Sequence, residues 1–142
     1  MRVLRQIILH QTGTATGTLE SIRRYHTEVL GWRDIGYNYL LTRDAKVHKG
    51  RPNSEAGAHC QGDNADSIGI CCVGEGDAFP LDTGYMTLGM FVELLKLIRT
   101  LRQAYPTITE ISGHREKPSG NAQGKTCPGF DAQIIRRLVQ GG

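Results

Sequence analysis

Residues that can bind a metal ion stand near the two ends of this sequence. His10 follows a short apolar run, while His114 and Cys127 lie in SGHREKPSGNAQGKTCPGFD at residues 112–131. Two imidazoles and a thiolate are good zinc ligands, and three protein ligands with an open fourth position define a catalytic zinc site. The same stretch carries Lys125, a cation two residues before the cysteine. These residues predict a zinc centre only if the fold brings them together.

The residue types alone leave other interpretations open. A histidine at the end of a strand is often only a polar terminus, and a lone cysteine is often a small buried hydrophobic residue. Cys127 could also be the nucleophile of a cysteine–histidine hydrolase, although this does not explain why His10 and His114 both stand at predicted strand ends. The H-x-E pattern of zinc deaminases occurs at residues 114–116, but the P-C-x-x-C part is missing. A deaminase is therefore excluded.

Hydrophobic patterning predicts the strands that must position the two histidines. Residues 3–9 are rich in Val, Ile and Leu and predict a first strand, with His10 at its carboxyl end. Residues 107–111 predict a later strand, and His114 stands just past its end. Ligand sites of α/β sheets collect at the carboxyl ends of strands. We therefore expect both histidines at the same edge of one sheet.

The remaining pattern alternates strands with helices. Further strands are predicted at residues 35–43, 47–49 and 67–73, with a hairpin turn at 43–46. Helices are predicted at residues 18–30, 88–104 and 130–139, with Gly31 ending the first and Thr87 capping the second. Most of residues 112–131 is expected to be loop. The sequence thus predicts an α/β fold: a single domain, residues 1–142, in which helices flank a central mixed β-sheet with the zinc site at the carboxyl ends of its strands.

Apolar stripes on two of these helices predict which side chains are buried. The first helix is expected to bury one face, and the second a core stripe. The expected positions are Leu19, Ile22, His26, Val29 and Leu30 on the first helix, and Leu88, Phe91, Leu95, Ile98 and Leu101 on the second.

Bulk properties exclude several classes of protein. The chain has 142 residues, which suffices for a core without disulfide or metal staples. Its net charge of +3 is too small to indicate a nucleic-acid partner, and no run of eighteen apolar residues predicts membrane insertion. The N-terminal apolar run is too short for a signal peptide, so we expect a cytoplasmic product with reduced thiols. Cys71 and Cys72 are adjacent on a predicted strand, so they should point to opposite faces and pack rather than pair.

Four segments of the chain carry the polar and glycine residues of one family of hydrolases. They are ILHQTGT at 8–14, GYNYLLTRDAKVHKGR at 36–51, GAHCQGDNADSIGICCVG at 57–74 and GHREKPSGNAQGKTCPGFD at 113–131. In order and spacing, they resemble the zinc-dependent N-acetylmuramoyl-L-alanine amidases, a family that includes the peptidoglycan recognition proteins. The likeness is greatest to the short amidase-type lysozymes of small tailed bacteriophages, and it covers nearly the whole chain.

The resemblance implies roles for five residues. His10, His114 and Cys127 would bind one zinc ion per chain, and Tyr37 and Lys125 would assist catalysis at the metal. Many members of the family carry Asp as the third ligand, and a thiolate is chemically competent in that place. Zinc lowers the pKa of bound water from about 15.7 towards about 7, and a lysine can stabilise the oxyanion of amide hydrolysis. From the residues alone, Tyr37 could be a core aromatic, and a solvated loop cation is the favoured interpretation of Lys125.

The family also implies a substrate and two residues that contact it. His59 and Asn64 lie in a loop that borders the peptide groove of family members, whereas the neighbouring Cys60 is expected to be inert. The implied activity is zinc-dependent hydrolysis of the amide bond between N-acetylmuramic acid and L-alanine, as a phage or prophage endolysin that reaches the wall after release. We expect peptidoglycan or a muropeptide as partner, no nucleic acid, no membrane insertion and a monomer. The alternative is a non-catalytic peptidoglycan-binding or regulatory protein of the same fold.

Overall fold

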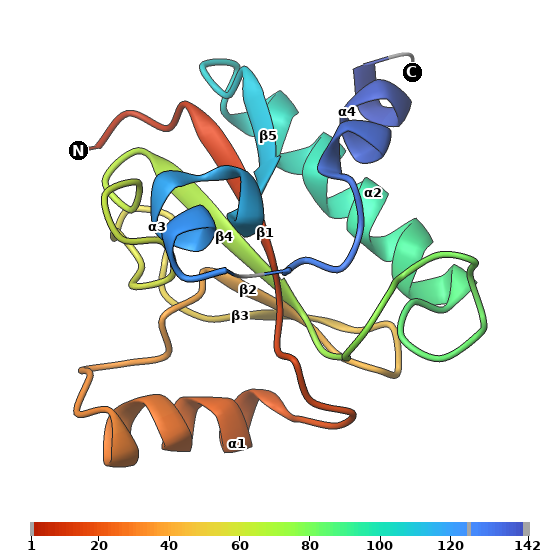
Figure 1. Cartoon of the computed structure of the whole chain (residues 1–142). Helices are drawn as coiled ribbons and strands as arrows, with labels where there is room; N and C mark the ends of the chain where they lie inside the picture. Colours follow the sequence, from red (N-terminus) through yellow and green to blue (C-terminus); the bar gives the residue numbers. More distant parts are fainter. Residues whose placement is uncertain (1, 125, 141–142) are drawn as a thin grey trace.

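A mixed five-stranded sheet forms the centre of the molecule, within residues 2–124 and 126–140 that the computed structural model describes (Figure 1). Its strands are β1 (Gln6–Gln11), β2 (Tyr39–Leu41), β3 (Val47–Lys49), β4 (Ser67–Cys72) and β5 (Glu110–Gly113), in the order β3-β2-β4-β1-β5. Strands β2, β4, β1 and β5 run parallel, and only β3 is antiparallel to its neighbour. The predicted mixed sheet is confirmed, and β1 lies inside it between two parallel partners.

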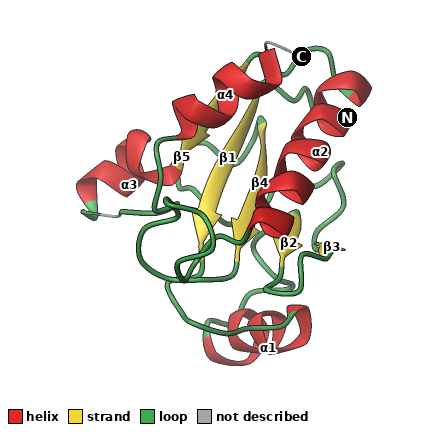
Figure 2. Ribbon diagram, turned by 90° about the vertical axis from the view of Figure 1, so that its right-hand side faces the viewer, coloured by secondary structure: helices red, strands yellow, loops and turns green. Residues whose placement is uncertain are grey.

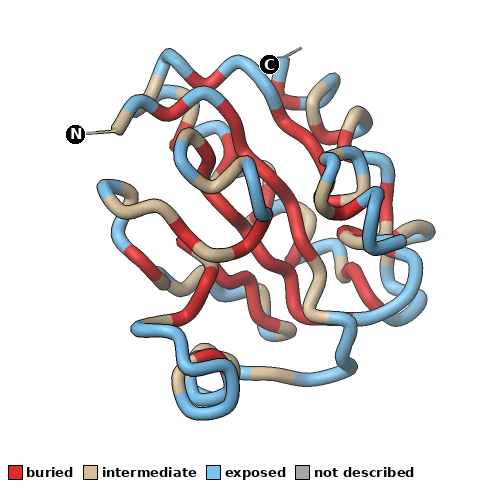
Figure 3. The backbone as a smooth tube through the Cα atoms, turned by 60° about the vertical axis from the view of Figure 1, so that its left-hand side comes forward, coloured by how far each residue is buried: buried red, intermediate tan, exposed pale blue. Residues whose placement is uncertain are grey.

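Two helices cover one face of the sheet, and another lies beyond the carboxyl ends of its strands (Figure 2). Helices α2 (Leu88–Ala104) and α4 (Ala132–Gln140) pack on the same face, where their apolar side chains join those of the strands in the main core. Figure 2 shows β1 and β4 pointing towards the separate helix α1 (Leu19–Arg24). Buried residues follow the central strands, whereas much of the α1 region is exposed (Figure 3). None of the described helices is long and apolar enough to cross a membrane.

The alternation of side chains along the strands separates the main core from the opposite face. Cys72 belongs to the main core, whereas Cys71 joins Leu40 and Val73 in a small cluster against the α1 region. The two adjacent cysteines therefore point to opposite faces, as predicted. His10 pairs in register with Cys71 across the parallel strands β1 and β4. Because paired residues of a sheet point to the same face, His10 lies on the face that α2 and α4 leave uncovered.

The first predicted helix forms at the expected place, but its apolar residues do not share one buried face. Helix α1 is six residues long and continues as a π-helix, η1 (Tyr25–Val29), which ends before Gly31 at φ +74°. Val29 and Leu30 are 67% and 42% exposed, so their predicted burial is wrong. The Leu30 amide bonds to the Tyr25 carbonyl, five residues back. This wider turn changes the helical phase, so positions four residues apart no longer share one face.

Helix α2 has the predicted bounds and cap, but part of its predicted stripe is wrong. The Thr87 Oγ1 accepts a hydrogen bond from the Met90 amide at 3.1 Å, as an N-cap should. The buried residues are Met90, Leu94, Ile98 and Leu101, whereas Leu88 is 56% exposed. The predicted stripe and the observed buried stripe both follow the helical period. The contact of α2 with the sheet and with α4 therefore decides which of the two stripes is buried most deeply.

The glycine- and proline-rich stretch after β5 contains more helix than predicted. A 3-10 turn, η2 (His114–Glu116), follows β5 directly, and α3 (Pro118–Ala122) follows η2. Pro118 stands at the start of α3, where its fixed φ suits a helix and its missing amide donor is not needed. The expectation of loop through most of residues 112–131 was therefore wrong. The predicted strand at 35–43 is likewise shorter, because only Tyr39–Leu41 pairs with its neighbours.

Candidate metal centre

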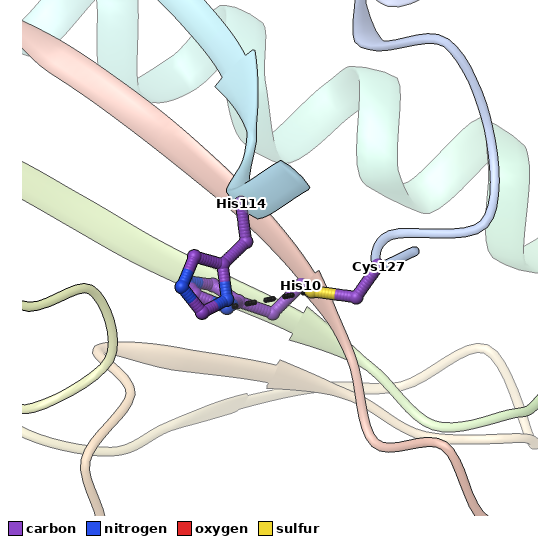
Figure 4. A group of neighbouring side chains, drawn as sticks. All are labelled: His10, His114 and Cys127. Carbon is purple, nitrogen blue, oxygen red and sulfur yellow. Dashed lines mark hydrogen bonds between the residues drawn. The ribbon is translucent and has the colours of Figure 1, made fainter. Parts of the chain in front are cut away.

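Three side chains from separate parts of the chain meet on the face of the sheet opposite α2 and α4 (Figure 4). His10 comes from β1, His114 from the start of η2, and Cys127 from the segment between α3 and α4. Their ligand atoms all lie within 4.8 Å of one another, and His10 Nδ1 is 3.9 Å from Cys127 Sγ. Both histidines are buried and Cys127 is partly buried. The parallel strands thus bring together residues that are far apart in the sequence.

Close backbone packing fixes the two segments that carry His114 and Cys127. The Arg115 amide donates to the Cys127 carbonyl at 3.0 Å, which joins η2 to the cysteine segment. A Cβ on Gly120 would overlap the His114 carbonyl, and a Cβ on Gly113 would lie 2.5 Å from the Pro128 ring. Glycine is therefore needed at both positions for this close approach. The cluster is held by the backbone around it as well as by its own side chains.

The donor set and its spacing fit a four-coordinate metal ion. Two imidazole nitrogens and a thiolate sulfur are favourable ligands for borderline-soft metals. With tetrahedral bonds of about 2.0 Å to nitrogen and 2.3 Å to sulfur, two such donors lie about 3.5 Å apart. The His10 Nδ1–Cys127 Sγ separation of 3.9 Å is close to this value. The cluster could therefore hold a metal ion after a small adjustment of side chains, with one position left for another ligand.

The Tyr37 ring packs beside the cluster. It lies just before β2, and its centroid is 5.3 Å from that of the His10 ring. Burial, followed by the neighbouring thiols of Cys71 and Cys127, raises the pKa of Tyr37 well above its usual value. The phenol therefore keeps its proton at neutral pH and can act as a hydrogen-bond donor. The sequence expectation that Tyr37 belongs to a strand is wrong, but the ring does lie at the cluster.

The cluster opens into the middle of three hollows that adjoin one another. The middle hollow has a volume of about 350 Å³ and is lined by all three cluster residues together with Trp32 and Tyr37. A second hollow, of about 440 Å³, shares Trp32 with it, and a third, of about 560 Å³, shares Tyr37. A ligand at the cluster can therefore extend in both directions over the surface.

Comparison with known proteins assigns this arrangement to a family. Residues 1–130 match the family model described as N-acetylmuramoyl-L-alanine amidase. The chain belongs to this amidase family. The endolysin of Enterobacteria phage K11 is 32% identical over 131 residues, covering 90% of this chain and 82% of the relative. The endolysin of Escherichia phage T7 is 34% identical over 113 residues, covering 80% and 70% respectively.

Solved structures support the same family assignment for this amidase fold. The N-acetylmuramoyl-L-alanine amidase LysC from Clostridium intestinale URNW aligns with a TM-score of 0.79 at 26% identity, over 96% of this chain and 85% of that one. The Ph2119 endolysin from Thermus scotoductus MAT2119 bacteriophage Ph2119 gives a TM-score of 0.78 at 28% identity, over 98% and 86%. The α/β architecture is therefore that of N-acetylmuramoyl-L-alanine amidases.

The structure of this amidase-family chain places the predicted substrate residues at the edge of the second hollow. His59 is buried, and its ring nitrogens contact His10 and Ser67. Burial, followed by the charge of His114, lowers the pKa of His59 to about 3. The Asn64 Oδ1 accepts hydrogen bonds from the amides of His59 and Cys60 at 3.0 and 2.9 Å. Both residues line the second hollow, and their contact with substrate stays a prediction.

Two further expectations about individual residues have different outcomes. Lys125, predicted to assist catalysis, lies outside the described residues. Cys60, expected to be inert, is buried with its Sγ 3.4 Å from Ser119 Oγ, and that oxygen is 3.2 Å from His114 Nε2. Cys60 is therefore linked to the cluster residue His114 through the Ser119 hydroxyl. Nothing in the sequence pattern marks Ser119 as a contact of His114, because the contact depends on how α3 turns back against η2.

Sequence reasoning missed two residues that line the middle hollow of the amidase fold. His26 was assigned to the apolar face of a helix, yet its ring lies 5.6 Å from that of Tyr37 and lines the hollow. Trp32 packs its ring 4.7 Å from His26 and remains 36% exposed. The only useful signal was that the single tryptophan of the chain stands next to Gly31, in a predicted loop.

Acidification is expected to destabilise wild-type protein more steeply than a His26→Asn variant below about pH 6.5. Burial, followed by the charge of Arg51, lowers the pKa of His26 from its usual 6.5, while His26 Nδ1 accepts a hydrogen bond from the Gly36 amide at 2.9 Å. Below pH 6.5 the unfolded chain gains a proton that the folded chain resists, so the free energy of unfolding decreases as pH falls. The limiting slope for one group is about 1.4 kcal/mol per pH unit.

The asparagine variant isolates this titration because its side-chain oxygen can accept the same hydrogen bond but cannot take up a proton. Urea unfolding of both proteins at pH 7.5, 6.5 and 5.5, at constant metal concentration, measures the difference. Other titrating groups are common to both proteins and cancel. Equal pH slopes for wild type and His26→Asn would contradict the prediction.

Proposed function

We propose that this chain hydrolyses the amide bond between N-acetylmuramic acid and L-alanine in peptidoglycan, with one zinc ion held by His10, His114 and Cys127. The observation that carries the proposal is the convergence of these three donors in the middle hollow of an amidase-family fold. Three ligands with an open fourth position are typical of catalytic zinc sites, whereas structural sites are closed by a fourth protein ligand. We further propose that residues 1–142 act as a single amidase domain.

The chemistry of the donors favours zinc over other common ions. A thiolate with two imidazoles suits zinc, whereas magnesium and calcium prefer oxygen ligands. Zinc bound at this place supplies a Lewis acid that activates water and polarises a carbonyl group. The protein would hold the ion in a partly enclosed hollow, since His10 and His114 are buried. Electrostatic stabilisation is stronger in such water-poor surroundings than in bulk solvent.

The proposed role of Tyr37 follows from its protonated hydroxyl beside the cluster. The phenol is buried near Cys71 and Cys127 and keeps its proton at neutral pH. It can donate a hydrogen bond to an oxygen that gains negative charge as the amide carbonyl is attacked. We assign the second donor to Lys125 on the family resemblance, because an ammonium group on a flexible stem can reach the same oxygen. Together the two donors would stabilise the transition state rather than hold the metal.

The hollows beside the cluster suggest how an extended substrate is held. Peptidoglycan has a glycan strand and a peptide stem on opposite sides of the scissile amide, and the cluster has a hollow on each side. We propose that His59 and Asn64 border the substrate groove at the second hollow. A soluble muropeptide that contains the amide and both flanking groups would then be the minimal substrate.

The named relatives favour a role in wall degradation, with one alternative. Relatives of phages K11 and T7 are endolysins, so we propose that this chain is a phage or prophage endolysin, made in the cytoplasm and acting on the wall as a monomer. The peptidoglycan-recognition protein SC2 of Drosophila melanogaster is 36% identical over 88 residues, covering 57% of this chain and 48% of the relative. That likeness supports the alternative of peptidoglycan binding without cleavage. The complete donor set of His10, His114 and Cys127 favours the enzyme.

Digestion of purified peptidoglycan is expected to release free L-alanine amino termini and no new reducing sugar ends. An amidase frees the amine of the stem peptide and leaves the glycosidic bonds intact. Amine labelling followed by mass spectrometry, with a reducing-sugar assay on the same sample, measures both products. His114→Ala protein serves as the control for contaminating hydrolases. Reducing ends as the sole product would exclude the amidase, and wall binding without either product would favour the non-catalytic alternative.

A further inference from the structure

The imidazole of His59 stands directly behind His10, on the side away from Cys127. His59 Nδ1 lies 2.8 Å from His10 Nε2, and His59 Nε2 lies 3.1 Å from Ser67 Oγ. The other ring nitrogen of His10, Nδ1, faces Cys127 Sγ at 3.9 Å. The two histidine rings are nearly perpendicular, at 88°. A line of hydrogen-bonding groups therefore runs from the cluster through His10 and His59 to the first residue of β4.

The chemistry of the two rings sets where the protons of this line must lie. A nitrogen that binds a metal presents a lone pair, so binding through His10 Nδ1 requires the His10 proton on Nε2. This N–H can donate only to a nitrogen without a proton. His59 must therefore accept at Nδ1 and carry its own proton on Nε2, where it can donate to the Ser67 hydroxyl. One tautomer of each ring satisfies both contacts.

The protein fixes the His59 ring in the orientation that this hydrogen bond needs. A Cβ on Gly69 would lie 2.5 to 2.7 Å from three atoms of the ring, and a Cβ on Gly57 would lie 2.7 Å from its Cδ2. Two glycines thus leave a slot that the ring fills. Asn64 Oδ1 also accepts a hydrogen bond from the His59 backbone amide at 3.0 Å, which anchors the backbone at His59. Such an enclosed ring cannot turn to exchange its two nitrogens without moving the strand or the loop.

We propose that His59 is a positioning residue for the metal centre. It accepts the proton on His10 Nε2 and thereby holds His10 in the tautomer and orientation that bind zinc through Nδ1. The inference rests on the proposed zinc centre and adds a role for a residue that is not a ligand. Partners of this kind fix the tautomer of a ligating histidine and increase its basicity, and their loss weakens metal binding by about 10- to 100-fold. The role does not require His59 to touch substrate.

Zinc affinity of matched variants tests the proposal. We expect His59→Ala to weaken zinc binding by about 10- to 100-fold, and His59→Asn to stay within about threefold of wild type, because its side-chain oxygen can accept the His10 proton near the place of Nδ1. His48→Ala is the control, since it removes an imidazole that bonds to Thr42 on the β2–β3 hairpin. Competition with a chromophoric chelator measures the dissociation constant of each zinc-loaded protein without reference to activity.

Nitrogen NMR of zinc-loaded wild-type protein gives an independent readout that needs no variant. We expect His10 to carry its proton on Nε2 and to show a coupling across the hydrogen bond to His59 Nδ1. A proton on His10 Nδ1, or a His59→Ala variant that binds zinc within twofold of wild type, would overturn the inference and leave the zinc centre intact. If His59→Ala does not fold, a 10-fold loss of affinity in His59→Asn also overturns it. A wild-type protein that binds no zinc refutes the proposed centre itself, and the inference with it.

Discussion

Replacement of Cys127 by alanine is expected to remove most of the bound zinc and to lower peptidoglycan turnover by about 10³-fold. The thiolate is one of three donors within 4.8 Å, so its loss leaves two imidazoles, too few to hold the ion firmly. A Lewis acid at the reacting carbonyl contributes several kcal/mol, and each 1.4 kcal/mol corresponds to about a tenfold rate change. Metal analysis of the purified variant and a muropeptide cleavage assay measure the two effects.

Two further cysteine substitutions make this result specific to the ligand. Cys127→Asp replaces the thiolate by a carboxylate, which also binds zinc, so part of the metal and of the activity should return. Cys72→Ala removes a buried thiol on the opposite face of the sheet and should retain full zinc content. Full zinc occupancy and activity in Cys127→Ala would show that the third ligand is another group. A Cys127→Asp variant that keeps zinc and loses all activity would instead favour Cys127 as a nucleophile.

The placement of the cluster histidines could be predicted because it depends on simple rules. A run of Val, Ile and Leu before His10 predicts a buried strand, and the carboxyl edge of a parallel sheet is where sites form. The structure places His10 within the last two residues of β1 and His114 directly after β5. His10 lies on the face of the sheet opposite α2 and α4. This placement follows from the register of β1 against β4, which no local pattern determines.

The surroundings of the cluster could not be predicted because they depend on contacts between distant segments. The wider turn at Tyr25 redirects the residues after it, exposing Val29 and leaving His26 in the wall of the middle hollow. The hydrogen bonds of His59 join it to residues on two different strands. Helical periodicity and residue spacing describe only neighbours in sequence, so neither feature has a local signal. The prediction for Lys125 depends wholly on the family resemblance.

Deletion of the Tyr37 hydroxyl is expected to lower turnover by about 10²- to 10³-fold while zinc content stays near that of wild type. Tyr37→Phe retains the ring that packs 5.3 Å from His10, so the fold and the cluster should survive. The hydroxyl is proposed to donate to the developing oxyanion, and removal of one such donor usually costs this much in kcat. Lys125→Ala should give a loss of similar size if it supplies the second donor.

Comparison of binding with turnover decides whether these two groups act on the transition state. An interaction that forms mainly as the oxyanion develops lowers kcat and leaves substrate affinity nearly unchanged. Binding of a muropeptide to Tyr37→Phe, Lys125→Ala and wild-type protein should therefore be similar, whereas cleavage rates differ by orders of magnitude. Tyr39→Phe is the matched control, because it deletes a phenol hydroxyl within β2, where the ring belongs to the main core. Wild-type turnover in Tyr37→Phe would show that the hydroxyl only packs against Cys71, and equal losses of binding and turnover would place it in substrate recognition instead.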